Sequence, residues 1–190
     1  LNMISETIKR YRTVDAIEFW QIENEPFLMV FGQCPGLDRE FLSREIVLVK
    51  SLDARKIILT ESGEFSTWIG AARRTDILGT SLYRIIYGRF GFYVHYPMPA
   101  IFYSRKVALI KKILNVEKII VIELQAEPWG PKQNWDLPLE EQFKSMDLDK
   151  FRKSIDYVKQ AGFSEAYLWG AEWWYWMKEK NSDNKIWEEA

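Results

Sequence analysis

Short apolar runs alternate with helical patterns along the whole chain, and this alternation constrains the fold more than any other sequence feature. Five runs have strand character, and some are almost continuously apolar, as in KIIVIEL at 118–124. Strands without polar alternation are buried on both faces, and helices are the usual connections between parallel strands. The sequence therefore predicts an α/β fold in a single domain, residues 1–190. The expected strands are residues 16–22, 56–60, 76–83, 118–124 and 166–170.

Helical spacing occupies the segments between these strands. Leu42, Ile46 and Val49 recur at the i, i+4 and i+7 positions after Asp38, which predicts a helix that begins at this aspartate. Gly162 is expected to end a later helix, because glycine readily adopts the left-handed backbone of a helix C-terminus. Further helices are expected at residues 3–11, 66–74, 107–114 and 185–189, with a loop at 87–99.

Charge and reactive side chains exclude several classes of protein. The chain carries 26 Lys and Arg against 27 Asp and Glu, so it lacks the positive charge of a nucleic-acid-binding protein. No apolar stretch approaches the ~18–20 residues that cross a bilayer. His95 is the only histidine and Cys34 the only cysteine, which disfavours a Ser-His-Asp triad and an internal disulfide. No cofactor and no metal ion is expected.

The first residues, Leu-Asn-Met, contain neither an initiator methionine nor a signal peptide. We therefore expect the chain to be an internal piece of a longer protein. Its localisation stays open for the same reason.

Polar side chains gather directly after the predicted strands. Carboxylates and amides follow the first strand at residues 23–26, and the fourth strand is followed by residues 123–129. Tryptophans and Glu172 follow the fifth strand, and shorter polar segments follow the other two at 60–64 and 81–84. Because loops at the carboxyl ends of barrel strands converge on one pocket, these residues predict a single site.

Two carboxyl groups from different strand ends suit glycoside hydrolysis. One carboxylic acid protonates the leaving oxygen, and a second, ionised carboxylate lies ~5–5.5 Å away in the retaining mechanism. The nine tryptophans provide flat rings that can stack on the C–H faces of sugars. The expected partner is therefore a carbohydrate substrate.

The segment FWQIENEP at 19–26 resembles the fourth-strand signature of glycoside hydrolase clan A. Its Asn-Glu-Pro ending is similar to family five cellulases and mannanases, and its Gln-x-Glu-Asn-Glu pattern to the β-galactosidases of families thirty-five and forty-two. The resemblance covers nearly the whole chain and implies strands four to eight of a (β/α)8 TIM barrel. It implies a retaining β-glycoside hydrolase that acts on β-linked oligo- or polysaccharides.

The same resemblance implies a role for each matching residue. Glu25 would be the general acid/base, and Asn24 would bind the sugar 2-hydroxyl. Glu123 would be the nucleophile, held in place by Tyr83, and Trp169 would form the floor of the sugar site. Trp129, Glu172 and Trp173 are the further expected substrate contacts.

Several alternatives remain open at this point. Glu127 is a rival nucleophile, although Glu123 directly follows the apolar run and is preferred. Ser81 stands where family five has a histidine, which weakens an assignment to that family. Competing functions are a non-catalytic carbohydrate-binding barrel remnant and a magnesium-dependent barrel enzyme with glutamate ligands. Some residues also have structural interpretations: Glu61 could cap a helix, and the tryptophans from 169 to 176 could pack beneath the barrel.

Overall fold

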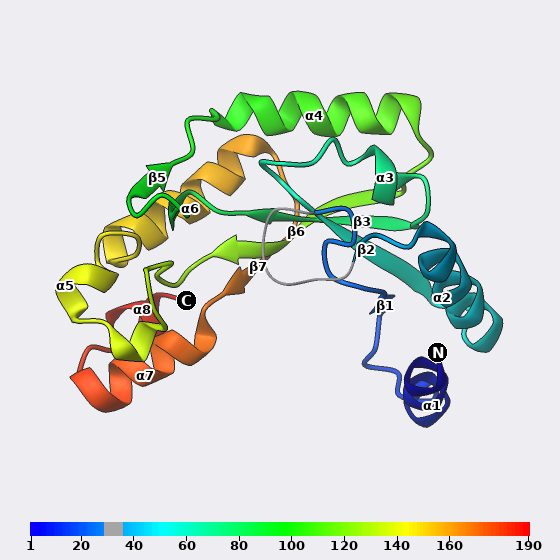
Figure 1. Cartoon of the computed structure of the whole chain (residues 1–190), viewed down its shortest axis with the longest axis horizontal. Helices are drawn as coiled ribbons and strands as arrows, with labels where there is room; N and C mark the ends of the chain where they lie inside the picture. The colour runs from blue at the N-terminus through cyan, green and yellow to red at the C-terminus, as the bar shows by residue number, and fades with distance from the viewer. Residues whose placement is uncertain (29–35) are drawn as a thin grey trace. The chain divides into compact units, whose positions relative to one another are not determined.

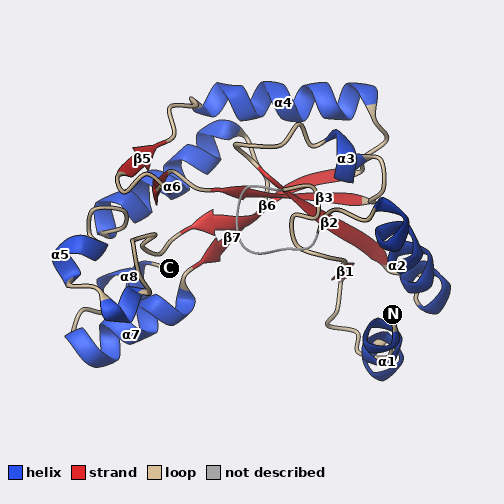
Figure 2. Cartoon of the chain, in the orientation of Figure 1, coloured by secondary structure: helices blue, strands red, loops and turns tan. Residues whose placement is uncertain are grey.

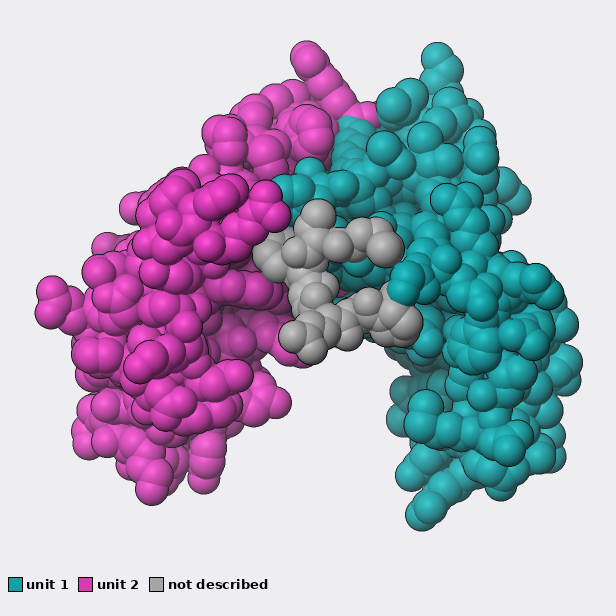
Figure 3. All heavy atoms as spheres, in the orientation of Figure 1, with its two compact units in different colours: residues 1–80, 106–120 teal, residues 81–105, 121–190 magenta. Residues whose placement is uncertain are grey.

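A computed structural model describes residues 1–28 and 36–190 of the chain. The chain forms two compact units (Figure 3): unit 1 comprises residues 1–80 and 106–120, and unit 2 comprises residues 81–105 and 121–190. Cys34 lies outside the described residues. No helix in the described part of the chain is long and apolar enough to cross a membrane.

Helices and strands follow one another through the described residues, with three strands in succession at residues 77–95 (Figures 1 and 2). The strands are β1 (Phe19–Gln21), β2 (Lys56–Ser62), β3 (Ile77–Leu82), β4 (Ile85–Tyr87), β5 (Tyr93–His95), β6 (Lys118–Gln125) and β7 (Ala166–Trp169). The helices are α1 (Asn2–Tyr11), α2 (Arg39–Leu52), α3 (Ile69–Ala72), α4 (Ala100–Ile113), α5 (Leu139–Gln142), α6 (Leu148–Ala161), α7 (Ala171–Asn181) and α8 (Lys185–Glu189). A 3-10 turn covers Asn134–Asp136.

The five predicted strands form one sheet in the order β1-β2-β3-β6-β7. The pairs β1–β2 and β6–β7 are parallel, with Trp20 opposite Ile57 and Val121 opposite Ala166. Each of the five strands is therefore added beside the one before it, which is the order in the wall of an α/β barrel. The predicted α/β class with a partial barrel is confirmed at this level, whereas the numbering of the strands as four to eight stays a prediction.

The core of unit 1 is built on β2. Ile57, Ile58 and Leu59 are all fully buried, as expected for a strand without polar alternation. Helix α2 begins where the sequence predicts it: the side chain of Asp38 accepts a hydrogen bond from the Phe41 N–H at 2.8 Å. Leu42 and Val49 from this helix are buried, so its apolar face is the predicted one.

The core of unit 2 lies among its helices. Gly162 ends α6 with a φ of 78°, which confirms the predicted helix end. Buried side chains from α6, α7 and α8, from the residue after β6 and from the segment before α6 pack into one cluster. Its buried members are Ala126, Met146, Phe151, Trp173, Trp174, Met177 and Ile186.

The structure differs from the sequence-based expectation in several places. The expected strand at 16–22 is shortened to β1, because only three of its residues pair with β2. The expected loop at 87–99 contains strand β5, which pairs antiparallel with β4. Helix α3 covers only four residues of the expected helix at 66–74. Helix α7 was not expected, because its aromatic residues surround the helix and leave no single apolar stripe.

Candidate active site

Glu25 lies in a tight turn that follows β1 in unit 1. Both Glu23 and Glu25 have a positive φ, 58° and 46° respectively, which costs a non-glycine residue about 1–3 kcal/mol. The buried hydroxyl of Thr60 holds this turn. Its Oγ1 accepts a hydrogen bond from the Glu25 N–H at 2.7 Å and donates one to Asn24 Oδ1 at 2.9 Å. The predicted Asn-Glu pair therefore has a fixed backbone conformation.

A pocket of about 220 Å³ lies beside this turn. Glu25, which is half-buried, contributes to its wall together with Glu23 and Asn24. Leu42 and Glu45 of α2 line the same pocket. The candidate acid/base thus borders a small cavity with several acidic neighbours.

Glu61 is a buried capping residue. Its Oε1 accepts a hydrogen bond from the Ala71 N–H of α3 at 3.1 Å, and its Oε2 accepts one from the hydroxyl of Ser66. Burial raises the pKa of Glu61. The structural interpretation of this carboxylate as a helix cap is therefore the correct one.

Lys106 is a half-buried cation that the sequence analysis missed. Its ammonium group donates to the Gly63 carbonyl at 2.9 Å and the Ser66 carbonyl at 2.6 Å. The same group lies 4.0 Å from the centre of the Trp68 ring. Burial lowers the pKa of Lys106 to about 8. Lys106 therefore holds the segment after β2 through hydrogen bonds to its carbonyl groups. The contact joins residues about 40 positions apart in the chain, so no local sequence pattern predicts it.

Glu123 lies on β6 in unit 2, within a stretch where the strand carries an extra residue relative to β7. Val121 is opposite Ala166 and Leu124 is opposite Leu168, so three steps on β6 match two on β7. The Tyr83 hydroxyl donates a hydrogen bond to Glu123 Oε2 at 3.0 Å. The structure thus brings together two residues that the sequence analysis singled out.

Gln125 is a supporting residue that the sequence analysis overlooked. It is fully buried, and its Oε1 accepts hydrogen bonds from the N–H groups of Arg84 and Ile85 at 2.8 and 3.0 Å. Its Nε2 donates to the Ile85 carbonyl at 2.6 Å. These three contacts hold the segment directly after Tyr83 against β6. The one signal in the sequence is an amide side chain placed between two acidic candidates.

Glu127 lies two residues beyond the end of β6. Its Oε1 accepts a hydrogen bond from the Trp169 indole N–H at 3.0 Å, and its Oε2 accepts one from the Asn134 side chain at 3.3 Å. Burial raises the pKa of Glu127, and the negative charge of Glu172 raises it further against the effect of the Trp169 hydrogen bond. Glu127 thus links the end of β7 to the loop at 127–136.

Gly170 makes the close approach of these two strand ends possible. Its φ of 146° is a backbone conformation that only glycine adopts easily. A Cβ at this position would lie 2.8 Å from the Ala126 carbonyl and from Glu127 Cβ. The Ala126 N–H also donates to the Trp169 carbonyl at 3.0 Å. Glycine at 170 therefore allows Glu127 and Trp169 to meet.

A pocket of about 610 Å³ lies along the loop at 127–136. Glu127, Trp129 and Asn134 line it. The ring of Trp129 packs edge-on against Tyr83, with 5.0 Å between ring centres, so this loop lies next to the Tyr83–Glu123 pair. Trp129 and Trp169 are 37% and 50% exposed, which leaves both rings accessible to a ligand.

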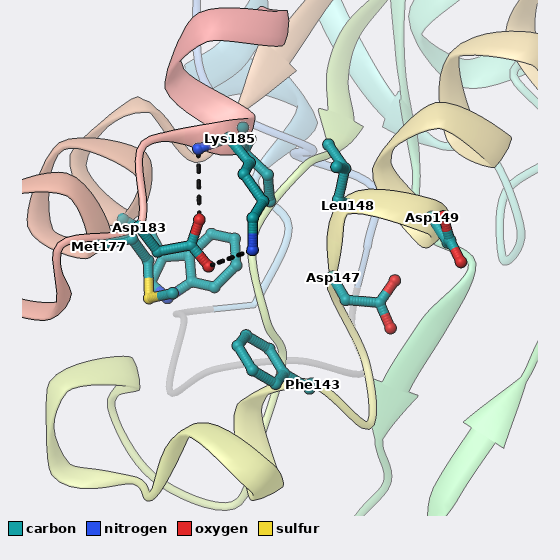
Figure 4. A pocket seen from close by; sticks show the side chains of 9 residues that line it. Phe143, Asp147, Leu148, Asp149, Met177, Asp183 and Lys185 are labelled. Carbon is teal, nitrogen blue, oxygen red and sulfur yellow. Dashed lines mark hydrogen bonds and ion pairs between the residues drawn. The ribbon is translucent and has the colours of Figure 1, made fainter.

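Trp173, an expected substrate contact, lies in the core of unit 2. It is only 3% exposed, and its indole N–H donates to Gln142 Oε1 at 2.6 Å. The part that it leaves open lines a pocket of about 430 Å³ among α5 to α8 (Figure 4), where Asp183 and Lys185 form an ion pair at 3.7 Å. Trp173 therefore fits the packing interpretation, whereas Glu172, its neighbour, is exposed at the start of α7.

Acidic groups do not gather into a metal site within the described ranges. No three His, Cys, Asp or Glu side chains of residues 1–28 and 36–190 are grouped so that they could hold a metal ion. The magnesium-dependent alternative therefore receives no support from this part of the chain.

Comparisons with known proteins identify the fold. No protein-family model matches the sequence, and no curated protein matches it. Among solved structures, the chain is similar to a β-glucuronidase of Faecalibacterium prausnitzii, with a TM-score of 0.56 and 19% identity over 88% of this chain. A GH2 β-galacturonidase of Eisenbergiella tayi gives 0.53 and 16%, and a GH113 β-1,4-mannanase gives 0.53 and 12%, each over 88% of this chain.

The chain spans 27%, 28% and 50% of the length of these three proteins. At such identities the likeness establishes the fold alone, a part of an α/β barrel that glycoside hydrolases also contain. An assignment to family five, thirty-five or forty-two stays a prediction.

Proposed function

We propose that the chain belongs to a retaining β-glycoside hydrolase, with Glu25 as general acid/base and Glu123 as nucleophile. The observation that carries this proposal is the hydrogen bond from the Tyr83 hydroxyl to Glu123 Oε2 at 3.0 Å. A hydroxyl donor stabilises the ionised form of a carboxylate, which is the form that a nucleophile needs. The fold shared with three glycosidases supports the same reaction class.

The reaction would proceed in two displacements. In the first, a Glu123 oxygen attacks the anomeric carbon while the Glu25 carboxylic acid donates its proton to the leaving oxygen, so the glycosidic bond breaks as the glycosyl-enzyme bond forms. In the second, the Glu25 carboxylate takes a proton from water, whose oxygen attacks the same carbon and releases Glu123. Asn24, fixed by Thr60, would bind the sugar 2-hydroxyl.

Glu127 is the weaker candidate for the nucleophile. Burial and the charge of Glu172 raise its pKa, which favours the neutral form that cannot attack. Its two oxygens already accept from Trp169 and Asn134. In the proposed site Glu127 orients the half-exposed Trp169 ring, which stacks on the sugar, while Trp129 and Glu172 contribute to more distant contacts.

The proposal is tested with variants of the full-length protein and a panel of aryl β-glycosides. Glu123→Ala should abolish turnover, and azide should restore part of it with formation of an α-glycosyl azide, because azide then attacks in place of the nucleophile. Glu25→Ala should instead give a β-glycosyl azide from the glycosyl-enzyme. Glu127→Ala is the matched control on the same segment and should retain measurable turnover without azide.

Three results would contradict the proposal. Wild-type activity in Glu123→Ala together with azide rescue of Glu127→Ala would exchange the two roles. Binding of oligosaccharides without turnover of any glycoside would identify the non-catalytic alternative. Loss of turnover on addition of a chelator would favour the magnesium-dependent enzyme.

A further inference from the structure

Glu45 is a buried carboxyl group that the proposed reaction does not use. It lies on the inner face of α2 and is 3% exposed. Its Oε2 has no hydrogen-bond partner among the residues that the structure describes. Burial of an ionised carboxylate without a donor is strongly unfavourable, so such a group tends to take up a proton instead.

The charged groups around Glu45 are mostly acidic. It lines the pocket of about 220 Å³ that also contains Glu23, Glu25 and Asp38. Glu23 lines the same pocket, and a hydrogen bond between the two carboxyl groups requires a proton on one of them. Burial raises the pKa of Glu45 most, the charge of Glu23 raises it further, and the amino group of Leu1 acts in the opposite direction.

Glu23 belongs to the strained turn that carries Glu25. Thr60 holds the later part of this turn through Asn24 and the Glu25 N–H. The residue at the start of the turn, Glu23, is itself in the left-handed conformation with a φ of 58°. A strained backbone persists only where its surroundings hold it at several points.

We propose that protonated Glu45 donates a hydrogen bond to the Glu23 carboxylate and thereby positions the turn that presents Glu25, which makes the site sensitive to pH. Glu45 is then a positioning residue, and this role rests on the proposed function, in which Glu25 is the acid/base. When Glu45 loses its proton, two negative charges repel each other at this pocket, and the hydrogen bond to the start of the turn is lost.

The direction of the pH effect follows from the raised pKa. The folded chain binds the Glu45 proton more tightly than the unfolded chain does, so stability falls as pH rises from the ordinary glutamate range through the raised pKa. Glu45→Gln removes this dependence, because its neutral amide donates to Glu23 at every pH. Its Tm should equal that of the wild type near about pH 4 and exceed it by about 2–4 °C at mildly alkaline pH.

The direct test is NMR of the carboxyl carbons and backbone amides of the whole chain. The Glu45 carboxyl should titrate above the ordinary glutamate range, and the Glu25 amide should shift with the same midpoint. Glu45→Gln should abolish that shift of the Glu25 amide, and Glu23→Gln should bring the titration of Glu45 closer to the ordinary range. Glu40→Gln, an exposed position on the same helix, should change neither.

Three outcomes overturn the proposal. These are titration of Glu45 in the ordinary range, a Glu25 amide shift that persists in Glu45→Gln, and a shift of the Glu45 signal on addition of millimolar Mg²⁺ or Ca²⁺. In the full-length enzyme, Glu45→Gln should reduce the alkaline loss of kcat/KM. If the NMR results are as expected but the full-length protein has no glycosidase activity, the proposed function is refuted. The proposed hydrogen bond between Glu45 and Glu23 is then still supported.

Discussion

The two candidate carboxylates are held by different means. Glu25 in unit 1 lies on a strained turn, where its N–H donates a hydrogen bond to the Thr60 hydroxyl. Glu123 in unit 2 lies on β6 beside the extra residue of that strand, and its Oε2 accepts a hydrogen bond from the Tyr83 hydroxyl. A substitution near Glu25 should therefore displace the carboxylate, whereas a substitution near Glu123 should change its chemistry more than its position.

Gly170→Ala should have the largest effect on stability, because it disrupts the close packing of residue 170 against Ala126 and Glu127 in unit 2. The new Cβ would meet the Ala126 backbone at 2.8 Å in a conformation that alanine resists, so we expect a loss of about 3 kcal/mol in the free energy of unfolding. Urea unfolding measures this loss. Gly162→Ala is the control: nothing lies within 4 Å of its new Cβ, and it should lose only about 1 kcal/mol. Equal losses in the two variants would show that the contact with Ala126 has no cost.

Thr60→Val tests the contribution of the Thr60 hydroxyl to the turn that carries Glu25. It keeps the shape of the side chain but removes the hydroxyl, so the Glu25 N–H loses its acceptor and Asn24 its donor. We expect a loss of about 2 kcal/mol in the free energy of unfolding, with a loss of turnover in the full-length enzyme. Thr60→Ser keeps the hydroxyl and should retain turnover. If both variants had the same activity, the turn would not depend on this hydroxyl.

Tyr83→Phe sharpens the comparison at Glu123. It removes the donor to Glu123 Oε2 and leaves the ring to pack against Trp129. We expect kcat/KM to fall about 10-fold, or about 1.4 kcal/mol of transition-state stabilisation. The measurement is kcat/KM on an aryl β-glycoside. Unchanged kinetics would remove the main support for Glu123 as the nucleophile.

Glu172→Gln should have the smallest effect. It removes a negative charge that raises the pKa of Glu127, so that pKa should fall, as measured by carboxyl NMR. Because a raised pKa makes stability decline as pH rises through it, the variant should also show a weaker decline over that range. The stability itself should change by less than about 0.5 kcal/mol, since Glu172 is exposed. Glu179→Gln, exposed on the same helix, should leave the titration of Glu127 unaltered.

The sequence predicted those parts of the fold that follow from local pattern. The buried run at 118–124 became β6, and Asp38 and Gly162 mark helix ends because their side chain or backbone meets a local requirement. The contacts of Gln125 and Lys106 could not be predicted, because their partners lie far away in the chain. Helix α7 was missed because its consecutive aromatic residues leave no periodic apolar stripe.

For the candidate site, the pairing of Tyr83 with Glu123 could be expected from the family resemblance, since both positions lie at the ends of predicted strands. The core position of Trp173 could not be, because its neighbour Trp174 and the half-exposed Trp169 have the same side chain. Residue type alone does not distinguish a tryptophan that packs in the core from one that can contact a ligand. The distinction depends on the position of each residue in the fold.

The extra residue of β6 between Val121 and Leu124 has a consequence for how this strand tolerates change in length. Successive side chains of a strand point to opposite faces, so a deletion of one residue there would restore the regular alternation and reverse the direction of the side chains on one side of the deletion. Glu123 and Gln125 would then lose their orientation relative to the preceding apolar residues while every contacting residue type was kept. In this strand, the number of residues determines to which face of the sheet the Glu123 side chain points. Homologous sequences with insertions or deletions at this point should therefore not be aligned by residue type alone.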